Sequence, residues 1–557
     1  MKKNFLRSRW LFTMLLFVTT MIMPSMMWAK SISPTRPNGE GTAENPYQIG
    51  TAAELYWFAG LVNGTLENVK QDASANAILM NNITVNEGVL DANKDLVSKS
   101  DFIEWTPVGN NIYAYTGTFD GKGYTVSGLY FNNPNSSLVG LFGFIGANGK
   151  ISNVGVLDSY FQFGEYGAGV CGINNGELQN CSNSSTVIGN MEQGIGGVCG
   201  KNAYDGIIEN CFNEGTVRAT TEEGTFVFGG VGGVCGINEM STIKSCYNTA
   251  SVSGKYAVGG VCGISSRGTT TNCYYLSNTA IGGIGGQDES GKAEKRSIEE
   301  FKSGEVAWLL NGKGLGEQVW GQQLGEDEYP VLGSAYKVIK AAQGDKDANG
   351  HYTYWATFSN RKNDVTLSVP SDRSLKVYNA TVSGGKMALT QRSDDQVAKG
   401  EGVLLKTDGE YVNAKANEKN ELEKASSDLV ATPDVAQTVP ADDGYILYRL
   451  TYNDATHKEH LGFYLSSSNG TSLKATPGKA YLQVSENEAK APSSAALARS
   501  FVFGGVNETT GIEGITIMGT DVQRHGTIEG IFDLQGRKIS NPTKGIYIKN
   551  NKKVIIK

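Results

Sequence analysis

The chain has 557 residues, a formal net charge of −7 at neutral pH and a sequence pI near 5.4. An acidic chain lacks the broad basic surface of nucleic-acid-binding proteins, so we expect no nucleic acid among its partners. The length is sufficient for several domains with a sizeable core. The chain has 71 glycines, and many of them recur at regular spacing in a repeat rather than in a low-complexity segment.

Residues 1–29 have the pattern of a secretory signal peptide. Four basic residues between positions 2 and 9 precede an apolar run over residues 10–23, and Ala29 offers a cleavage position. The run is short for a membrane-spanning helix. No cysteine stands directly after the apolar run, which argues against a lipid anchor at this point. We therefore expect the chain to be exported after cleavage near Ala29.

Residues 30–104 precede the repeats and are predicted to cap them. Thr51 and Glu54 match a capping box, apolar residues follow at helical spacing from Leu55, and Gly64 is placed to end the helix. A cap in this position would cover the open edge of the first coil.

Residues 105–286 are organised by a repeated phrase, Gly-Gly-Val-Cys-Gly followed about eleven residues later by Asn-Cys-x-Asn. The first cysteine of the phrase recurs at positions 171, 199, 235 and 262, which are 28, 36 and 27 residues apart. A period of this size indicates a solenoid. The apolar runs are short and β-like, and so many glycines disfavour a helical repeat. We therefore expect a right-handed parallel β-helix.

Asparagines recur at two places in each copy of the phrase. Asparagine tolerates the left-handed backbone conformation, so we expect these residues at corners of the coils. Stacked about 4.8 Å apart, their side chains would hydrogen-bond to one another in ladders. The two sets are Asn174, Asn202 and Asn238, and Asn183, Asn213 and Asn248.

The repeats resemble the GLUG motif, a glycine-rich repeat named for a Gly-Leu-x-Gly core. Residues 140–143 keep that core, and the later copies carry Val-Cys in place of Leu-x. Residues 118–126 are similar to the entry coil of such proteins. The resemblance implies an adhesin-like secreted or surface protein of the kind found in Bacteroidetes, and it supplies no catalytic residues.

The segments after the repeats are predicted to differ in character. Residues 287–337 would cap the β-helix, with a helix that begins at the Ser297–Glu300 capping box and ends near Asn311. Residues 338–505 contain many short alternating segments between turns, which favours an antiparallel β-sandwich. Residues 506–525 have the composition of a linker.

Residues 526–557 form a basic tail. The stretch from Gly530 to Lys538, followed by Lys-Gly-Ile-Tyr-Ile at 544–548, is similar to a type IX secretion C-terminal sorting domain. The resemblance implies a small β module that engages outer-membrane secretion machinery, and a secreted or outer-membrane-surface location in a Gram-negative bacterium. The alternative is a small β module with a solvated basic edge.

All eight cysteines lie in the repeats. In an exported chain the regular spacing allows four disulfides, one within each coil. The alternative is two stacked ladders of buried thiols that fill space between coils. The disulfide pairs would be Cys171 with Cys181, Cys199 with Cys211, Cys235 with Cys246, and Cys262 with Cys273. We expect no metal site and no cofactor, since there is no Cys-x-x-Cys and no histidine in the repeats.

Aromatic residues also recur along the repeats. If they line up on one outer face, they would form a platform for a glycan or a protein, and the alternative is that they fill the core. The candidates are Tyr204, Tyr247, Tyr256 and Tyr274.

The sequence favours a non-catalytic, adhesin-like binding protein that presents a repetitive β-helix face to a glycan or host polymer. One alternative is a carbohydrate-active β-helix enzyme, which would need clustered carboxylates. Another is a spacer that carries the 338–505 domain. The acids that an enzyme could use are Asp158, Glu177, Asp205, Glu209 and Glu214.

Overall fold

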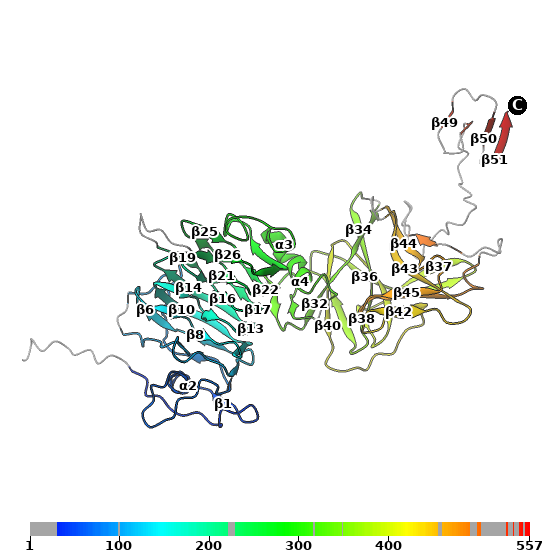
Figure 1. Cartoon of the computed structure of the whole chain (residues 1–557). Helices are drawn as coiled ribbons and strands as arrows, with labels where there is room; N and C mark the ends of the chain where they lie inside the picture. Colours follow the sequence, from blue (N-terminus) through cyan, green and yellow to red (C-terminus); the bar gives the residue numbers. More distant parts are fainter. Residues whose placement is uncertain are drawn as a thin grey trace, which may run out of the picture. The chain divides into compact units, whose positions relative to one another are not determined.

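The computed structural model describes residues 31–98, 101–220, 229–315, 318–347, 349–454, 459–490, 498, 500–502, 531–532, 538–539, 545–549 and 552–556. The predicted signal peptide at 1–29 and the predicted linker at 506–525 lie outside these residues. The chain divides into two compact units between Val338 and Ile339 (Figure 1).

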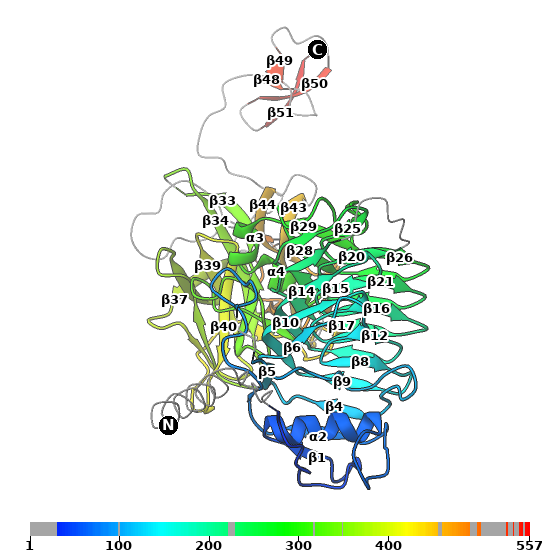
Figure 2. The ribbon, with the colours of Figure 1, turned by 90° about the vertical axis from the view of Figure 1, so that its left-hand side faces the viewer.

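The first unit is a parallel β-solenoid, as predicted, in which successive coils add one strand to each of several long sheets. Figure 2 shows the coils stacked on one another. One sheet has eight strands, in the order β1 (Tyr47–Ile49), β2 (Ala77–Leu79), β4 (Thr118–Asp120), β9 (Lys150–Ser152), β13 (Glu177–Gln179), β17 (Ile207–Glu209), β22 (Thr242–Lys244) and β27 (Thr269–Thr271).

A second sheet has eleven strands on the adjoining side of the coils. Its main path runs through β29 (Ala293–Arg296), β28 (Cys273–Leu276), β23 (Tyr247–Asn248), β18 (Phe212–Asn213), β14 (Ser182–Gly189), β10 (Gly155–Phe163), β5 (Thr125–Ser127) and β3 (Ile83–Thr84). Beside this path lie β6 (Tyr130–Asn132), β19 (Val217–Ala219) and β24 (Val252–Ser253).

Two five-stranded sheets complete the coils, and the Gly-Val-Cys-Gly phrase links them. The glycine sheet contains β25 (Ala257–Gly259), β20 (Gly230–Gly232), β15 (Ile195–Gly196), β11 (Glu165–Gly167) and β7 (Ser137–Val139). The cysteine sheet contains β26 (Cys262–Ser266), β21 (Cys235–Glu239), β16 (Cys199–Ala203), β12 (Cys171–Asn174) and β8 (Phe142–Ile145).

The glycines of the phrase lie where a side chain would collide with backbone. A β-carbon on Gly196 would be 1.9 Å from the carbonyl oxygen of Cys199, and one on Gly200 would be 2.6 Å from the nitrogen of Gly167 in the glycine sheet. Only glycine allows so close an approach of two sheets. The equivalent residues of the next coil, Gly232 and Gly236, have the same restriction, with nearest backbone atoms at 1.9 and 2.4 Å.

The predicted asparagine ladders are confirmed. The amide nitrogen of Asn174 donates to Asn202 at 2.8 Å, and that of Asn202 donates to Asn238 at 3.0 Å. A second ladder joins Asn183, Asn213 and Asn248 at 2.8 and 2.7 Å. These six side chains are fully buried.

The prediction that these asparagines adopt the left-handed conformation is wrong. One set of left-handed corners lies instead at the residue before each second cysteine, which is Asn180, Asn210, Ser245 or Asn272, with φ between 52° and 55°. The ladder asparagines do not need a special backbone conformation, because their role is to supply side-chain donors and acceptors inside the stack.

The N-terminal end of the solenoid is closed by α2 (Ala52–Asn63), and the predicted helix is confirmed. Thr51 Oγ1 accepts a hydrogen bond from the Glu54 amide at 3.3 Å, and Gly64 ends the helix with φ of 68°. Figure 2 shows α2 across the end of the stack. The segment before residue 105 is more than a cap, since β1 and β2 pair in parallel and extend the eight-stranded sheet.

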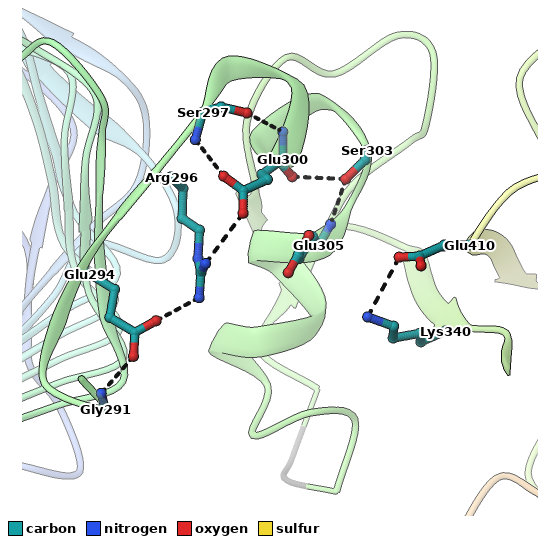
Figure 3. A network of polar contacts seen from close by, with 9 residues as sticks. All are labelled: Gly291, Glu294, Arg296, Ser297, Glu300, Ser303, Glu305, Lys340 and Glu410. Atoms are coloured by element: carbon teal, nitrogen blue, oxygen red, sulfur yellow. Dashed lines mark hydrogen bonds and ion pairs between the residues drawn. The ribbon is translucent and has the colours of Figure 1, made fainter. Parts of the chain in front are cut away.

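The C-terminal end is closed by two short helices rather than the single helix that was predicted. Ser297 and Glu300 form the expected capping box at the start of α3 (Ile298–Lys302). Gly304, with φ of 90°, then separates α3 from α4 (Glu305–Leu310). Arg296 donates to Glu294 at 2.6 Å and to Glu300 at 3.3 Å, so the last solenoid strand is joined to the cap (Figure 3).

The cap continues beyond α4 with a short antiparallel pair, β30 (Trp320–Gly321) and β31 (Val331–Leu332). Phe301 and Trp320 pack with Tyr247 of the solenoid in one buried cluster. The end of the coil stack is therefore covered by apolar side chains.

The second unit is built from antiparallel sheets, as predicted, but it has more layers than a two-sheet sandwich. One sheet contains β32 (Tyr336–Lys340), β40 (Tyr411–Ala416), β35 (Val365–Ser368) and β38 (Gln396–Val397). The central sheet contains β33 (Ala342–Lys346), β34 (Tyr352–Ser359), β39 (Gly402–Thr407), β36 (Leu375–Ser383) and β37 (Lys386–Gln391).

A third sheet contains β41 (Leu429–Ala431), β46 (Ala480–Ser485), β43 (Tyr445–Asp454), β44 (Glu459–Leu465) and β47 (Ser500–Val502), and β42 (Gln437–Pro440) pairs with β45 (Ser472–Ala475). The central sheet is buried on both faces. Val403 and Leu405 belong to one core, and Leu404 between them belongs to the other.

The described strands of the tail form a four-stranded antiparallel sheet. Its strands are β48 (Ile531–Phe532), β49 (Lys538–Ile539), β50 (Gly545–Lys549) and β51 (Lys552–Ile556).

Candidate binding surface

Two of the four candidate tyrosines are buried, and their assignment to an exposed face is wrong. Tyr247 is fully buried, stacks on Phe212 with ring centroids 5.0 Å apart, and donates to the carbonyl oxygen of Pro330. Tyr274 lies in the same cluster under the C-terminal cap. The solenoid end needs apolar cover, and these rings supply it. A repeat pattern alone does not show which coils lie beneath a cap.

The other two tyrosines are exposed, at different corners of the solenoid. Tyr204 follows β16 of the cysteine sheet and keeps 60% of its surface accessible. Tyr256 precedes β25 of the glycine sheet and is 44% exposed. The buried carboxylate of Glu192 accepts hydrogen bonds from the amides of Lys255 and Tyr256, which fixes the second corner.

The corner at Tyr204 repeats on the next two coils. Tyr204, Met240 and Arg267 each follow a strand of the cysteine sheet, and each has a left-handed φ, of 51°, 49° and 53°. The Asp205 amide donates to the carbonyl of Met240 at 2.9 Å, and the Met240 amide donates to that of Ser266 at 3.0 Å. These bonds hold the corners of three coils together. We call Tyr204, Met240 and Arg267 the corner row.

Several side chains around the corner row are apolar and accessible. Met240 is 38% exposed, and Ile207, which begins the next strand after Tyr204, is 36% exposed. Half-buried residues stack in register on the adjoining cysteine sheet, and four of the five are apolar. They are Phe144, Ile173, Lys201, Ile237 and Ile264. The surface is therefore periodic and mixed, with apolar side chains beside Arg267, Asp205 and the ion pair of Lys201 with Glu239 at 2.7 Å.

All eight cysteines are free and buried, so the possible disulfide pairing within each coil is not formed in the structure. The cysteines stack between coils instead. Cys171, Cys199, Cys235 and Cys262 are in register on the cysteine sheet, each donating its thiol to a carbonyl two residues later, at 3.0–3.3 Å.

The second cysteines form another ladder. The backbone amide of Cys181 donates to the sulfur of Cys211 at 3.4 Å, and that of Cys211 donates to Cys246 at 3.3 Å. Burial raises the pKa of the Cys211, Cys246 and Cys273 thiols, so these groups stay protonated. The alternative of stacked thiols describes the structure, and a thiol in this environment is an apolar filler rather than a nucleophile.

The candidate acids come from three coils, with Asp205, Glu209 and Glu214 in the same coil, and three of the five pair with lysines. Glu177 lies 3.1 Å from Lys150, and Glu209 lies 2.7 Å from Lys244. Asp158 pairs with Lys94 at 3.0 Å. Asp205 and Glu214 are exposed and have no such pair among the described residues.

Over the described parts of the chain, no three His, Cys, Asp or Glu side chains are arranged to hold a metal ion. None of the described helices has the length and hydropathy needed to cross a bilayer.

Parts of this chain are similar in sequence to a known motif and to parts of two known proteins. The model of the GLUG motif matches residues 192–218, which include one full glycine and cysteine phrase. Halomucin of Haloquadratum walsbyi is 28% identical over 174 residues, which are 30% of this chain and 2% of halomucin. A proposed glycine-rich membrane protein of Evansella cellulosilytica is 32% identical over 127 residues, which are 22% of this chain and 12% of that protein.

The chain thus spans only a small part of the length of these relatives. A crystal structure of a Bacteroides ovatus protein, named as a proposed immunoglobulin A1 protease, is also similar. It covers 54% of this chain and 95% of its own at 19% identity, with a TM-score of 0.37. The GLUG motif and the β-solenoid fit a surface repeat protein of adhesin-like type.

Proposed function

We propose that this chain is a secreted or cell-surface binding protein, adhesin-like and non-catalytic, whose solenoid presents the corner row to a glycan or another extracellular polymer. The observation that carries the proposal is the exposure of Tyr204, Met240 and Ile207 on neighbouring coils that backbone hydrogen bonds hold in register. Tyrosine supplies a large contact area with little loss of side-chain entropy, which suits a sugar ring or a protein segment.

The repetition supports an extended partner. Successive coils place equivalent positions about 4.8 Å apart, so a polymer that lies along the stack can contact Tyr204, Met240 and Arg267 on three neighbouring coils. Many weak contacts of this kind add up to firm retention through effective concentration. The ion pairs of Glu177 and Glu209 with lysines support a structural role for these carboxylates rather than glycoside cleavage, where two carboxyl groups flank the scissile bond.

Export would place this surface outside the cell. The signal-peptide pattern at 1–29 and the sorting-like tail at 526–557 support a route through the outer membrane of a Gram-negative bacterium, with the tail as the segment that contacts the secretion machinery. Fusion of residues 526–557 to a reporter protein, in a strain with and without type IX secretion, tests that role. Surface delivery in both strains would contradict it.

Retention of the full chain on insoluble polysaccharides and matrix proteins tests the proposed function. We expect one class of polymer to retain the wild type, and the Tyr204→Ala/Met240→Ala variant to lose most of that retention. Tyr445→Ala is a matched control, because Tyr445 is 40% exposed but belongs to the second unit. Equal loss in the control, or unchanged retention of the double variant, would contradict the assignment of the corner row.

A further inference from the structure

The second unit contains an open pocket of about 360 Å³ between the central sheet and the third sheet. Trp355 on β34, Leu450 on β43 and Tyr481 on β46 contribute its apolar wall, and β45 contributes Leu473. The volume lies in the range of small-molecule sites. The pocket is separate from the corner row, since every residue that lines it belongs to the second unit.

The pocket is cationic. Lys340, Arg449, Lys474 and Lys479 line it, and no Asp or Glu is among its described lining residues. The Lys340 ammonium lies 3.6 Å from Glu410, which neutralises part of its charge (Figure 3). Arg449 and Lys474 are exposed, and neither forms an ion pair with any residue in the described ranges. Among the described residues, these two positive charges of the pocket lining therefore have no counter-charge.

The rim of the pocket is held rigidly. Thr432 Oγ1 donates to the carbonyl of Lys479 at 2.8 Å, and the Thr432 amide donates to the same carbonyl at 3.0 Å. The Arg361 guanidinium donates to the carbonyls of Thr432 and Ala431 at 2.9 and 2.7 Å. Tyr452 on the opposite side donates its hydroxyl to the carbonyl of Gln343 at 2.9 Å. A site fixed in this way loses little entropy when a ligand binds.

We propose that this pocket binds an anionic saccharide, a sugar residue that carries a carboxylate or a sulfate group. The anionic group would pair with Arg449 and Lys474, since guanidinium and ammonium groups recognise such oxyanions through charged hydrogen bonds. The hydroxyls of Thr357, Thr451 and Thr476 line the same pocket and suit the hydroxyls of a sugar ring. The apolar wall suits the carbon face of that ring.

The shape and the lining favour a saccharide over an acidic peptide. The cations gather at one pocket rather than along a sheet edge, so a single compact ligand can satisfy them. An acidic peptide would also meet the cations, but it offers backbone amides to the threonine hydroxyls in place of the several hydroxyls of a sugar ring. The proposal does not depend on the corner row. An experiment can therefore refute binding at one of the two sites without refuting binding at the other.

Isothermal titration calorimetry of the full chain tests the proposal with four probes, which are a heparin-derived hexasaccharide, an oligogalacturonate, maltohexaose and hexaglutamate. We expect binding of at least one anionic saccharide and no binding of maltohexaose. The affinity should fall with added salt because the interaction is electrostatic. The first two probes distinguish sulfate from carboxylate as the recognised group.

Matched variants decide whether the pocket is the site. Arg449→Gln/Lys474→Gln should weaken binding of the anionic saccharide by about tenfold or more, as expected for the loss of charged hydrogen bonds. Lys376→Gln/Lys386→Gln removes the same charge from exposed lysines outside the pocket and should retain wild-type binding. Tyr204→Ala/Met240→Ala should also bind normally. Absence of binding, equal binding of hexaglutamate, or equal loss in the lysine control would overturn the proposal.

Discussion

The side chain of Asn213 occupies the position that a β-carbon on Gly197 would need. Such an atom would lie 2.3 Å from Cγ and 2.4 Å from Oδ1 of Asn213. Gly169 has the same relationship with Asn183, and Gly233 with Asn248. The two halves of the repeated phrase are therefore one structural unit, in which the second glycine makes room for the ladder asparagine.

This relationship predicts the effect of a single methyl group. Gly197→Ala should lower the free energy of unfolding by about 2 kcal/mol or more, because the new β-carbon overlaps Asn213 and the carbonyl oxygen of Gly233. Urea denaturation measures the change. Gly50→Ala is the control, since the nearest atom to its β-carbon is 3.2 Å away on the exposed side chain of Asn81. Similar losses in both variants would refute this account of the phrase.

The asparagine ladder predicts that Asn202 cannot be replaced by its acid. Asn202 is fully buried, its amide donates to Asn238 and to two carbonyls, and its oxygen accepts from Asn174. Asn202→Asp would remove the donors and place a charge beside carbonyl oxygens, at a cost of about 3 kcal/mol or more at neutral pH. Asn135→Asp, on the exposed surface, should change stability by less than about 0.5 kcal/mol. Chemical denaturation of both variants measures these two changes in the free energy of unfolding.

A pH dependence follows from Asp120, which accepts a hydrogen bond from Asn153 at 3.0 Å and pairs with Lys122 at 2.9 Å. Burial alone would raise the pKa of this carboxyl, but the hydrogen bonds from Asn153 and Lys122 and the Lys122 charge outweigh it and lower the pKa. A lowered folded-state pKa means that the carboxylate stabilises the fold above the unfolded pKa of about 3.9. That stability is lost as the pH falls through the folded-state value.

Asp120→Asn should therefore cost about 1 kcal/mol at pH 7, and the difference from the wild type should shrink below pH ~4. Stability measured by denaturation at several pH values tests this expectation. Asp158→Asn is the control, because that carboxylate pairs with Lys94 at 3.0 Å with 64% of its side chain exposed, where ion pairs contribute little. A pH-independent difference for Asp120→Asn would contradict the proposed role of its charge.

The cysteine ladders predict the outcome of a thiol titration without reductant. We expect eight reactive thiols after denaturation, and negligible reaction of the native chain, because every cysteine is free and buried. Mass spectrometry after alkylation provides an independent count. Fewer than eight thiols in freshly purified chain, with linked peptides between cysteines, would show that the exported protein carries disulfides.

Much of the solenoid could be predicted from the sequence because glycine, cysteine and asparagine recur once or more in each coil. Those residues have strict steric and hydrogen-bonding requirements, and the same requirement recurs in each coil. The location of the left-handed corners at Asn180 and its equivalents was not predicted, since both sets of asparagines tolerate that conformation. The split between α3 and α4 was signalled by Gly304 but hidden by the apolar spacing on either side.

The candidate surface was predictable only in part. Tyr204 and Tyr256 are exposed and Tyr247 and Tyr274 are not. The two buried tyrosines directly follow a second cysteine of the phrase, but this position alone does not show that a cap covers them. Their burial depends on the cap at 287–337, which is remote in sequence. Met240 was missed because only aromatic residues were considered, and equivalence to Tyr204 within the repeat could have found it. The residues that line the pocket of the second unit come from seven strands and the segments beside them, so no local pattern identifies Arg449 and Lys474 as parts of one pocket.

The central claim is that this chain holds a polymer and does not cleave it. The most direct test incubates the full chain with the polymer that retains it, and follows bound protein and released soluble product over time. We expect saturable retention that stays constant, with no product above the protein-free control. Progressive release of soluble fragments that depends on the amount of chain would contradict the claim and would direct attention to the carboxylates at Asp158, Glu177 and Glu209.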